Sequence, residues 1–297
     1  LIVRVNMNNI TKNIILAPFN LLYNISPELE LKLMFFLKQG YRLNLKNPKS
    51  FNEKIQWIKL YDHNPLMPKC CDKYLVREYI KEQGCEELLV KLLWEGTNPR
   101  EIPFDDLPDK FVIKVTHGST FNIICTDKNK LNREEAIEKC LKWLKAKFLP
   151  CYGEWFYGAE KPRVIVEEFL ESDDGKQLRD YKVVCCNGEP VVIRVDSDRF
   201  TGHKTDLYDL NWNIKQGVRW KHPNTNQVLP KPECLEELYS YARKLSQNFN
   251  LARVDFYIVK NRIYFGEITF TSCAGFDRFY PREFDYELGN YLKLPTK

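Results

Sequence analysis

The sequence lacks the cysteine spacing of a metal-binding domain. None of its ten cysteines stands in a C-x-x-C pair, and only four histidines are present. Zinc ribbons need such two-residue knuckles, so we expect no structural zinc site. Cys70-Cys71 and Cys185-Cys186 are direct neighbours, and adjacent cysteines rarely bridge each other. We interpret the cysteines as small hydrophobic residues in a reducing cytoplasm, which is the expected location.

An excess of charge of one sign is also missing. The chain has 45 Lys and Arg against 40 Asp and Glu, a net charge of +5, and no run of five like charges. This balance indicates an ordinary mixed-charge surface and excludes the basic footprint of a nucleic-acid-binding protein. Hydrophobic residues make up 44% and charged residues 29%, which is typical of a globular chain and argues against long disordered segments.

Long hydrophobic runs are absent as well. The longest apolar stretch, residues 14–25, is interrupted by one Pro and two Asn and is too short to cross a bilayer. It has no signal-peptide cleavage site, so we expect no transmembrane segment. Residues 8–40 carry Lys12, Lys32 and Lys38 among Leu, Phe and Tyr. A packed helical subdomain is the favoured interpretation of this segment, and an amphipathic region on a membrane surface is the alternative.

Helical signals dominate the first third of the chain. Residues 1–45 are predicted to be helical, with Ser26-Pro27-Glu28 as a helix start. Another helix is predicted to begin at Ser50, because Ser50 and Glu53 have capping-box spacing. Further helices are expected from Asp72 to near Gly84, at residues 132–148 and at residues 232–248.

Strand signals dominate the rest. Branched and alternating residues predict strands at residues 88–94, 111–115, 163–170, 181–186, 190–196, 252–259 and 262–268. Asn187-Gly188 and Asn261-Arg262 are predicted hairpin turns. The pattern indicates an α+β fold with an antiparallel sheet near its C-terminal end.

The strongest chemical signal is the last predicted hairpin. Period-two alternation puts Arg253 and Asp255 on one face, and Glu267 and Thr269 on one face of the partner strand. Because the opposite face is apolar, the two carboxylates must converge, and paired hard oxygen ligands favour magnesium. The alternative is an everyday salt bridge with Arg253, and the hairpin alone does not separate the two.

A lysine and a polar loop give the second signal. Lys114 ends an apolar strand and is followed by residues 116–120, whose backbone amides are suited to cradle phosphate. A buried lysine is costly unless it meets an anion. The Walker pattern is absent, and a Lys114 side chain that reaches solvent is the alternative.

Two acidic residues at a strand end give the third signal. Glu167 and the following residues can offer a carboxylate and backbone groups to an adenine edge, with Leu170 packed on the ring. Asp174 is suited to reach ribose hydroxyls. The alternatives are a strand edge protected by charge and a solvated turn.

Taken in order, these pieces resemble the TupA-like branch of the ATP-grasp enzymes, which is associated with teichuronopeptide and other bacterial surface-polysaccharide pathways. The resemblance covers residues 45–297. Its motifs are Phe51-Asn-Glu-Lys-Ile-Gln-Trp57, Asp72-Lys73-Tyr74, Val76-Arg77, residues 111–119 and 167–170, Asp180-Tyr-Lys182, Asn187-Gly188, and residues 253–256 and 266–270.

The resemblance implies a ligase that uses ATP and Mg2+ to activate a carboxylate as an acyl phosphate and join it to an amine of a small molecule or glycan. The residues implied to bind the nucleotide are Lys73, Lys114, Thr116, Gly118, Ser119, Glu167, Phe169, Leu170 and Asp174. Those implied to hold magnesium are Asp255, Glu267 and Thr269, and the implied catalytic residues are Arg253 and Lys114.

The sequence departs from the family at two positions. Most ATP-grasp enzymes have Asn where this chain has Thr269, although a Thr hydroxyl can still ligate metal directly or through water. Thr120 stands where a second loop glycine is usual. Lys182 and Arg194 lie on neighbouring predicted strands, and a place in the cleft or in solvent is open for each.

The resemblance implies three parts: a helical N-terminal part (1–71), an ATP-grasp lid subdomain with the phosphate loop (72–170) and a larger sheet subdomain with the metal site (171–297). ATP and magnesium would lie between the last two. The alternative functions are an ATP-grasp-type kinase that phosphorylates a hydroxyl and a non-catalytic nucleotide- or glycan-binding module. A glycosyltransferase is disfavoured, because the one DxD match, at residues 196–198, does not stand in a suitable strand-end context and a lone DxD is weak evidence. The oligomeric state is left open.

Overall fold

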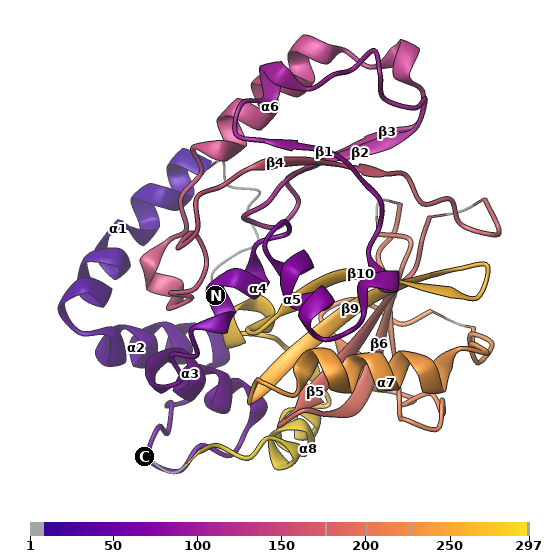
Figure 1. The fold of residues 1–297 in the computed structure, drawn as a ribbon. Helices are drawn as coiled ribbons and strands as arrows, with labels where there is room; N and C mark the ends of the chain where they lie inside the picture. Colours follow the sequence, from indigo (N-terminus) through magenta and orange to yellow (C-terminus); the bar gives the residue numbers. More distant parts are fainter. Residues whose placement is uncertain (1–8, 176, 200, 226, 296–297) are drawn as a thin grey trace.

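The N-terminal part is built from two helices that meet in a V (Figure 1). We describe them from a computed structural model that covers residues 9–175, 177–199, 201–225 and 227–295. Helix α1 spans Asn9–Ile25 and α2 spans Pro27–Gln39. Ser26 caps α2, because its hydroxyl accepts a hydrogen bond from the backbone N–H of Leu29 at 3.4 Å. A helix break is thus encoded where the sequence predicted a helix start.

The prediction of helix for residues 1–45 is only partly right. It is confirmed for most of residues 9–39, whereas residues 40–45 are not helical. Helix α2 ends because Gly40 adopts a φ of 78°, a left-handed conformation in which glycine has no steric penalty. Residues 1–8 lie outside the described residues.

Helix α3, Phe51–Tyr61, begins with the predicted capping box. The Ser50 hydroxyl accepts from the Glu53 backbone N–H, and the Glu53 carboxylate accepts from the Ser50 backbone N–H at 3.0 Å. The same carboxylate also accepts from the backbone N–H groups of Asn44 at 3.1 Å and Lys49 at 2.9 Å. One buried side chain therefore fixes both the start of α3 and the loop that leads to it.

The remaining helices are mostly shorter than predicted. They are α4 (Leu66–Cys71), α5 (Val76–Glu82), α6 (Arg133–Leu144), α7 (Leu235–Ser246) and α8 (Glu283–Tyr291). No α4 or α8 was predicted. Among the described residues, no helix combines the length and apolarity that crossing a bilayer needs.

Strands form two antiparallel sheets, one above the other in Figure 1. The smaller sheet has the order β1-β4-β2-β3, with β1 at Leu92–Gly96, β2 at Phe111–Val115, β3 at Asn122–Cys125 and β4 at Val164–Glu168. Helix α6 packs on it and closes a separate core. The strand predicted at 88–94 is displaced, because residues 86–88 form a short 3-10 helix.

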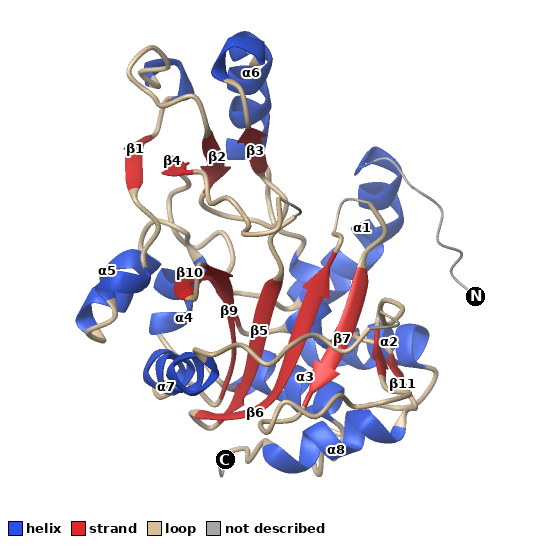
Figure 2. Ribbon diagram, turned by 90° about the vertical axis from the view of Figure 1, so that its right-hand side faces the viewer, coloured by secondary structure: helices blue, strands red, loops and turns tan. Residues whose placement is uncertain are grey.

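The larger sheet has the order β10-β9-β5-β6-β7 (Figure 2). Its strands are β5 (Asp180–Cys186), β6 (Glu189–Ser197), β7 (Lys204–Tyr208), β9 (Leu251–Val259) and β10 (Arg262–Thr269). A ribbon of β8 (Arg219–Trp220) and β11 (Phe279–Tyr280) lies beyond β7. The hairpin turn predicted at Asn261-Arg262 lies one residue earlier, since Lys260 and Asn261 carry the positive φ angles.

The α+β class is therefore confirmed, with two cores. Helix α7 packs on the larger sheet, and the buried side chains of α5 belong to that core rather than to the core of the smaller sheet. The division of the chain at residues 72 and 171 stays a prediction.

Helix α3 also holds the loop that follows β10. Gln56 donates to the carbonyls of Ala274 at 3.1 Å and Gly275 at 2.8 Å, and the buried Lys59 donates to Ala274 O at 2.8 Å. A Cβ at Gly275 would lie 2.5 Å from the Gln56 amide nitrogen, so the close approach requires glycine. The N-terminal helices thereby fix the exit of the strand that carries Glu267 and Thr269.

Replacing Glu53 with Ala should lower the free energy of unfolding by about 2 kcal/mol or more, because three backbone N–H groups lose a charged acceptor. Urea unfolding followed by circular dichroism measures the change. Glu138→Ala is the matched control: its carboxylate is 58% exposed and pairs only with Arg100, so it should change stability by less than about 1 kcal/mol. Equal losses in the two variants would contradict the assignment of Glu53.

Candidate nucleotide and metal site

Four charged side chains lie in one row across the larger sheet. The register pairs Glu267 of β10 with Asp255 of β9, Asp255 with Lys182 of β5, and Lys182 with Arg194 of β6. Side chains directly opposite in a sheet point to the same face. A second row on that face contains Asp180, Asp196 and Thr205. The backbone pairing alone therefore gathers the acids and bases of this sheet at one place.

The guanidinium of Arg253 joins the three oxygen groups that were predicted to hold metal. It donates to both oxygens of Asp255, at 2.7 and 2.8 Å, to Glu267 at 3.2 Å and to the hydroxyl of Thr269 at 3.0 Å. Burial alone would raise the pKa of Asp255, but the charges of Arg253 and Lys182 outweigh it and lower the pKa. Asp255 is thus held as a carboxylate although it is 2% exposed.

Lys182 lies among three buried carboxylates. Its ammonium donates to Asp255 and lies 3.5 Å from Asp180 and 4.0 Å from Asp196. Lys182 is 4% exposed, so it is buried among these carboxylates and does not face solvent. The same holds for Arg194, which binds both oxygens of Asp196 at 2.8 and 3.0 Å. The sequence had left both positions open.

Asp196 is the second strongly held carboxylate of the face. It also accepts from Thr205 at 3.0 Å, and His203 Nε2 lies 3.3 Å from it. Burial would raise its pKa, but the charge of Arg194 and further cations hold the pKa well below its ordinary value. The His203 ring stacks on His222 at 3.7 Å between centroids. Burial lowers the pKa of both histidines, that of His222 to about 4, so both are neutral near pH 7.

A second group of charged side chains is centred on Glu167 of β4. Lys114 donates to Glu167 at 2.6 Å, and Arg77 contacts the other oxygen of Glu167 at 3.1 Å. Burial lowers the pKa of Lys73, whereas the charge of Glu267 raises it and that of Lys114 lowers it further. Lys73 is therefore within electrostatic range of both Glu267 and Lys114. The two sheets bring their charged residues to one region.

The Lys73 side chain holds the loop after β2 through hydrogen bonds to its backbone carbonyls. The ammonium of Lys73 donates to the carbonyl of Gly118 at 2.7 Å, and the Thr116 hydroxyl accepts from the Arg163 backbone N–H at 3.0 Å. Gly118 has a φ of 83°, and Thr120 has a φ of 66°. A β-branched residue in this left-handed region is strained, which explains why glycine suits position 120. Ser119 is exposed, and no hydrogen bond of its side chain is seen among the described residues.

His117 is placed away from this chemistry. Its ring is 6% exposed, contacts the Ala146 carbonyl at 3.0 Å and packs edge-on against Phe121 and Phe148. A packing role accounts for these contacts.

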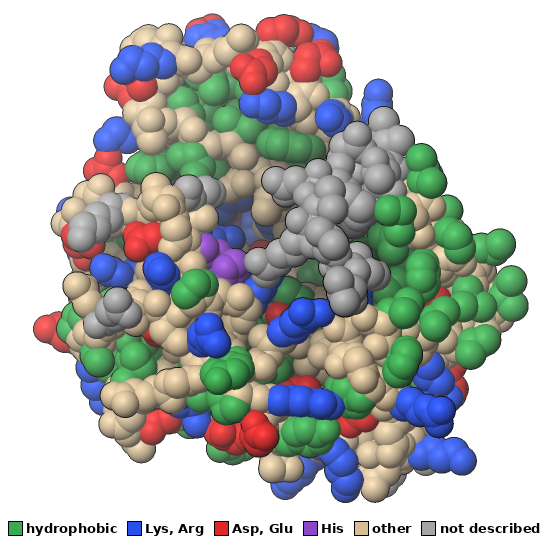
Figure 3. Space-filling view, turned by 180° about the vertical axis from the view of Figure 1, so that it is seen from behind, with side chains coloured by type: hydrophobic (Ala, Val, Ile, Leu, Met, Phe, Trp, Pro, Cys, Tyr) green, Lys and Arg blue, Asp and Glu red, His purple; other side chains and the backbone are tan. Residues whose placement is uncertain are grey.

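A cavity of about 760 Å3 lies between the two sheets. Lys114, Asn122 and residues 167–172 line one side of it, and Asp180, Arg199 and Tyr257 line the other. Phe169 and Leu170, which were predicted to bind the nucleotide, line this cavity. Asp174 is not among its lining residues, and its carboxylate pairs with Arg179 at 3.4 Å. In Figure 3 a hollow separates the upper and lower parts of the molecule, with Lys and Arg side chains at its floor.

Three residues that line the cavity were given no role from the sequence: Asp180, Arg199 and Tyr257. Asp180 is 2% exposed and accepts from Arg199 at 2.8 Å. Two signals were available: Asp180 stands in a motif of the resemblance, and the alternation that placed Arg253 and Asp255 on one face puts Tyr257 on the same face.

Most of the chain matches one family of proteins. The sequence pattern of the family described as TupA-like ATPgrasp matches residues 53–293. No curated protein matches the chain.

Several solved structures are weakly similar. An L-amino acid ligase from Bacillus licheniformis has a TM-score of 0.48 at 14% identity, over 82% of this chain and 56% of that one. A D-alanine–D-alanine ligase from Bacillus anthracis, solved with ATP, has 0.43 at 15%, over 68% and 55%. An N5-carboxyaminoimidazole synthase from Aspergillus clavatus has 0.44 at 14%, over 77% and 52%. This chain spans about half the length of these proteins, and its family assignment rests on the sequence match alone.

The buried Asp196 predicts a pH dependence of stability. Its folded-state pKa is below the unfolded value of about 3.9, so its ion pairs stabilise the fold above that pH and lose this effect as the pH falls. Asp196→Asn should melt well below wild type at pH 7, and the difference should shrink below about pH 4. Thermal unfolding between these pH values measures it. A difference that stays constant with pH would contradict the charged state of Asp196.

Proposed function

Because the chain belongs to the TupA-like ATP-grasp family, which fixes its α+β fold as an ATP-grasp, we propose that it is an ATP- and Mg2+-dependent ligase. In this proposal it joins a carboxylate to an amine, each on a small molecule or glycan of bacterial surface-polysaccharide biosynthesis. The observation that carries the proposal is the hydrogen-bonded group of Arg253, Asp255 and Glu267. The charges of Glu267 and Lys114 both act on the pKa of Lys73, so this group lies within electrostatic range of the lysines. Acids and bases in this arrangement suit the transfer of a phosphoryl group.

The cavity between the sheets is proposed to take ATP. Its volume of about 760 Å3 is within the usual range for small-molecule sites, about 300–1,000 Å3. Phe169 and Leu170 offer apolar surface and backbone groups to the base, and Lys114 lies on the phosphate side. Glu167 forms ion pairs with Lys114 and Arg77. Its proposed contact with the adenine amino group must therefore coexist with those ion pairs.

Two carboxylates and a hydroxyl of the sheet are the donor set proposed for magnesium. The described residues contain no group of three or more His, Cys, Asp or Glu that could hold a metal ion. Glu267 has 43% of its side chain exposed, and Thr269 lies 3.2 Å from it. These oxygens and those of Asp255 are the hard ligands that Mg2+ prefers, and they are the residues proposed to hold it. When bound, the ion supplies positive charge for the phosphate oxygens.

The proposed reaction has two steps. A carboxylate oxygen of the first substrate attacks the terminal phosphorus of ATP, the bond from that phosphorus to the bridging oxygen breaks, and ADP leaves. The amine nitrogen then attacks the acyl carbon, phosphate departs and the nitrogen loses a proton. Arg253 is proposed to orient the carboxylate and to stabilise the oxyanion of the second step. Lys182 keeps Arg253 and Asp255 in register by sharing the carboxylate.

A screen for ADP release over pairs of amino acids and uronic acids tests the proposal. Wild type should turn over at least one pair, and Glu267→Gln should reduce kcat by about a hundredfold or more, since charge stabilisation of the transition state is lost. Glu236→Gln is the control, because Glu236 is an exposed residue of α7. Wild-type activity in Glu267→Gln would remove the metal assignment.

Trapping with hydroxylamine separates ligase from kinase. An acyl phosphate reacts with hydroxylamine to give a hydroxamate, whereas a phosphoester does not. We expect hydroxamate to form with the carboxylate substrate and ATP in the absence of the amine. ADP release without hydroxamate would favour phosphorylation of a hydroxyl. Nucleotide binding without any ADP release would favour a binding module.

A further inference from the structure

Large exposed hydrophobic side chains are concentrated on α1 and α2. Eight of them lie on these two helices, each at least 41% exposed. They are Ile14, Ile15, Leu21, Ile25, Leu29, Leu33, Phe36 and Leu37. Elsewhere in the described residues such side chains are few and scattered, as at Val228. Single exposed apolar residues are normal, but a contiguous patch marks an interaction surface. Figure 3 shows hydrophobic side chains gathered along the edge of the molecule where these helices lie.

The exposed residues follow helical spacing. On α2, Leu29, Leu33 and Phe36 stand at i, i+4 and i+7, on the side opposite to the buried Leu31 and Phe35. A surface helix needs one apolar side to pack on its own core, and here Leu31 and Phe35 already serve that purpose. We call the second apolar side, formed by Leu29, Leu33, Phe36 and Leu37, the outer stripe. Neither hydrophobic core of the described residues includes these four side chains.

A basic segment, which we call the cationic rim, follows the outer stripe in the chain. The segment between α2 and α3 carries Arg42, Lys46 and Lys49, all exposed, and no ion pair of these three is seen among the described residues. The chain has no acidic residue between Glu30 and Glu53. Glu28, next to the outer stripe, is paired with Lys32 at 2.6 Å. The rim therefore has an uncompensated positive charge.

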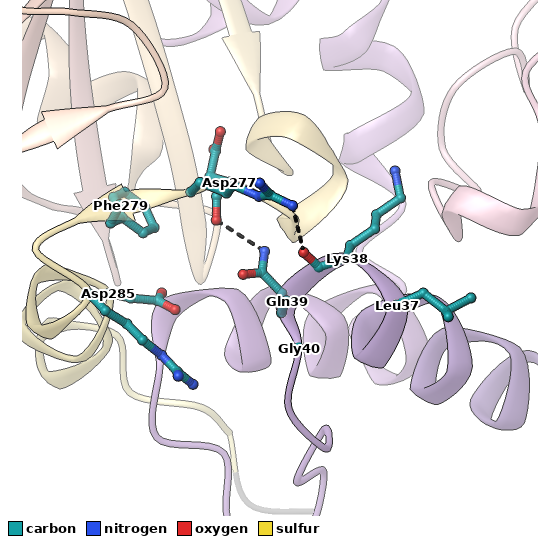
Figure 4. Close-up of a pocket in the computed structure, with 9 residues that line it drawn as sticks. Leu37, Lys38, Gln39, Gly40, Asp277, Phe279 and Asp285 are labelled. Carbon is teal, nitrogen blue, oxygen red and sulfur yellow. Dashed lines mark hydrogen bonds between the residues drawn. The ribbon is translucent and has the colours of Figure 1, made fainter. Parts of the chain in front are cut away.

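A pocket extends this rim at the end of α2 (Figure 4). It measures about 340 Å3, and Leu37 of the outer stripe lines it together with Lys38, Arg278 and Arg282. Arg278 donates to the Lys38 carbonyl at 3.3 Å, and Gln39 donates to the Asp277 carbonyl at 3.0 Å. These bonds tie α2 to the segment before α8. Of the pocket's two acids, Asp285 is turned to Asn52, and both are buried.

We propose that the outer stripe and the cationic rim dock on an anionic lipid surface, with α1 and α2 lying in the plane of the headgroups. Helices of this kind bind by burying apolar side chains at the acyl boundary while basic residues contact acidic headgroups. A symmetric pair of two copies would instead bring two positive rims together, which the charges oppose. The docking does not depend on the proposed ligase activity.

Flotation of the full chain with vesicles tests this. Wild type should float with vesicles of equal parts phosphatidylcholine and phosphatidylglycerol, and much less with phosphatidylcholine alone or at high salt. Each cation near the surface is worth about a fivefold change in partitioning, so a variant with Arg42→Gln, Lys46→Gln and Lys49→Gln should bind on the order of a hundredfold less. Leu33→Gln with Phe36→Gln should lose binding on both lipids.

Val228→Gln is the matched control, since Val228 is 63% exposed and lies far along the chain from the outer stripe. All substituted side chains are exposed, so unchanged melting temperatures should show that the variants fold. Absence of wild-type binding, or binding that the outer-stripe variant retains, would overturn the proposal. Sedimentation velocity tests the remaining outcome. If wild type forms a dimer and does not bind vesicles, and the Leu33→Gln, Phe36→Gln variant is a monomer, the outer stripe is the interface with a second copy of the chain.

Discussion

The ion pair between Arg253 and Asp255 is the interaction on which the site depends. Asp255 is buried and 13% of the Arg253 side chain is exposed, so each charge would be costly to place there alone. The bidentate bond fixes the guanidinium so that its remaining N–H reaches Glu267 and Thr269. Lys182 then binds the same carboxylate from the neighbouring strand. The Arg253–Asp255 pair on β9 thereby positions Glu267 and Thr269 of β10 and Lys182 of β5. All of these side chains belong to strands rather than to loops.

The same network explains why the face is polar in a sheet that is otherwise core. Val184 and Val192 follow Lys182 and Arg194 on the same face, one pair further along the strands, and both are buried. Burial of charge is tolerated at one end of the face because each carboxylate has a cation within hydrogen-bonding reach. The other end is closed by apolar packing.

The sequence was informative where the signals are local. Alternation over residues 252–268 predicted the hairpin and the shared face of Arg253 and Asp255, and capping-box spacing predicted the start of α3. Lys182 stayed ambiguous because its partner lies 73 residues away in the chain, and pairing of β5 with β9 leaves no local trace. Four short strands, β3, β7, β8 and β11, were missed, since two to five residues carry too little periodicity. The turn at Lys260-Asn261 was misplaced by one residue, because both residues had to enter the left-handed region.

The balance of charge on the face has a consequence for the order of binding. Arg253, Lys182 and Arg194 pair with Asp255, Asp180 and Asp196, so Glu267 is the one partly exposed acid among the described residues of the two charged rows. A divalent ion arriving alone would find one accessible carboxylate on this face, and the cations Lys73 and Lys114 nearby would oppose its approach. A triphosphate carries more negative charge than the ion carries positive charge, so the complex of the two stays attracted to these lysines. Under the proposed function, the ion and the nucleotide are therefore expected to bind together.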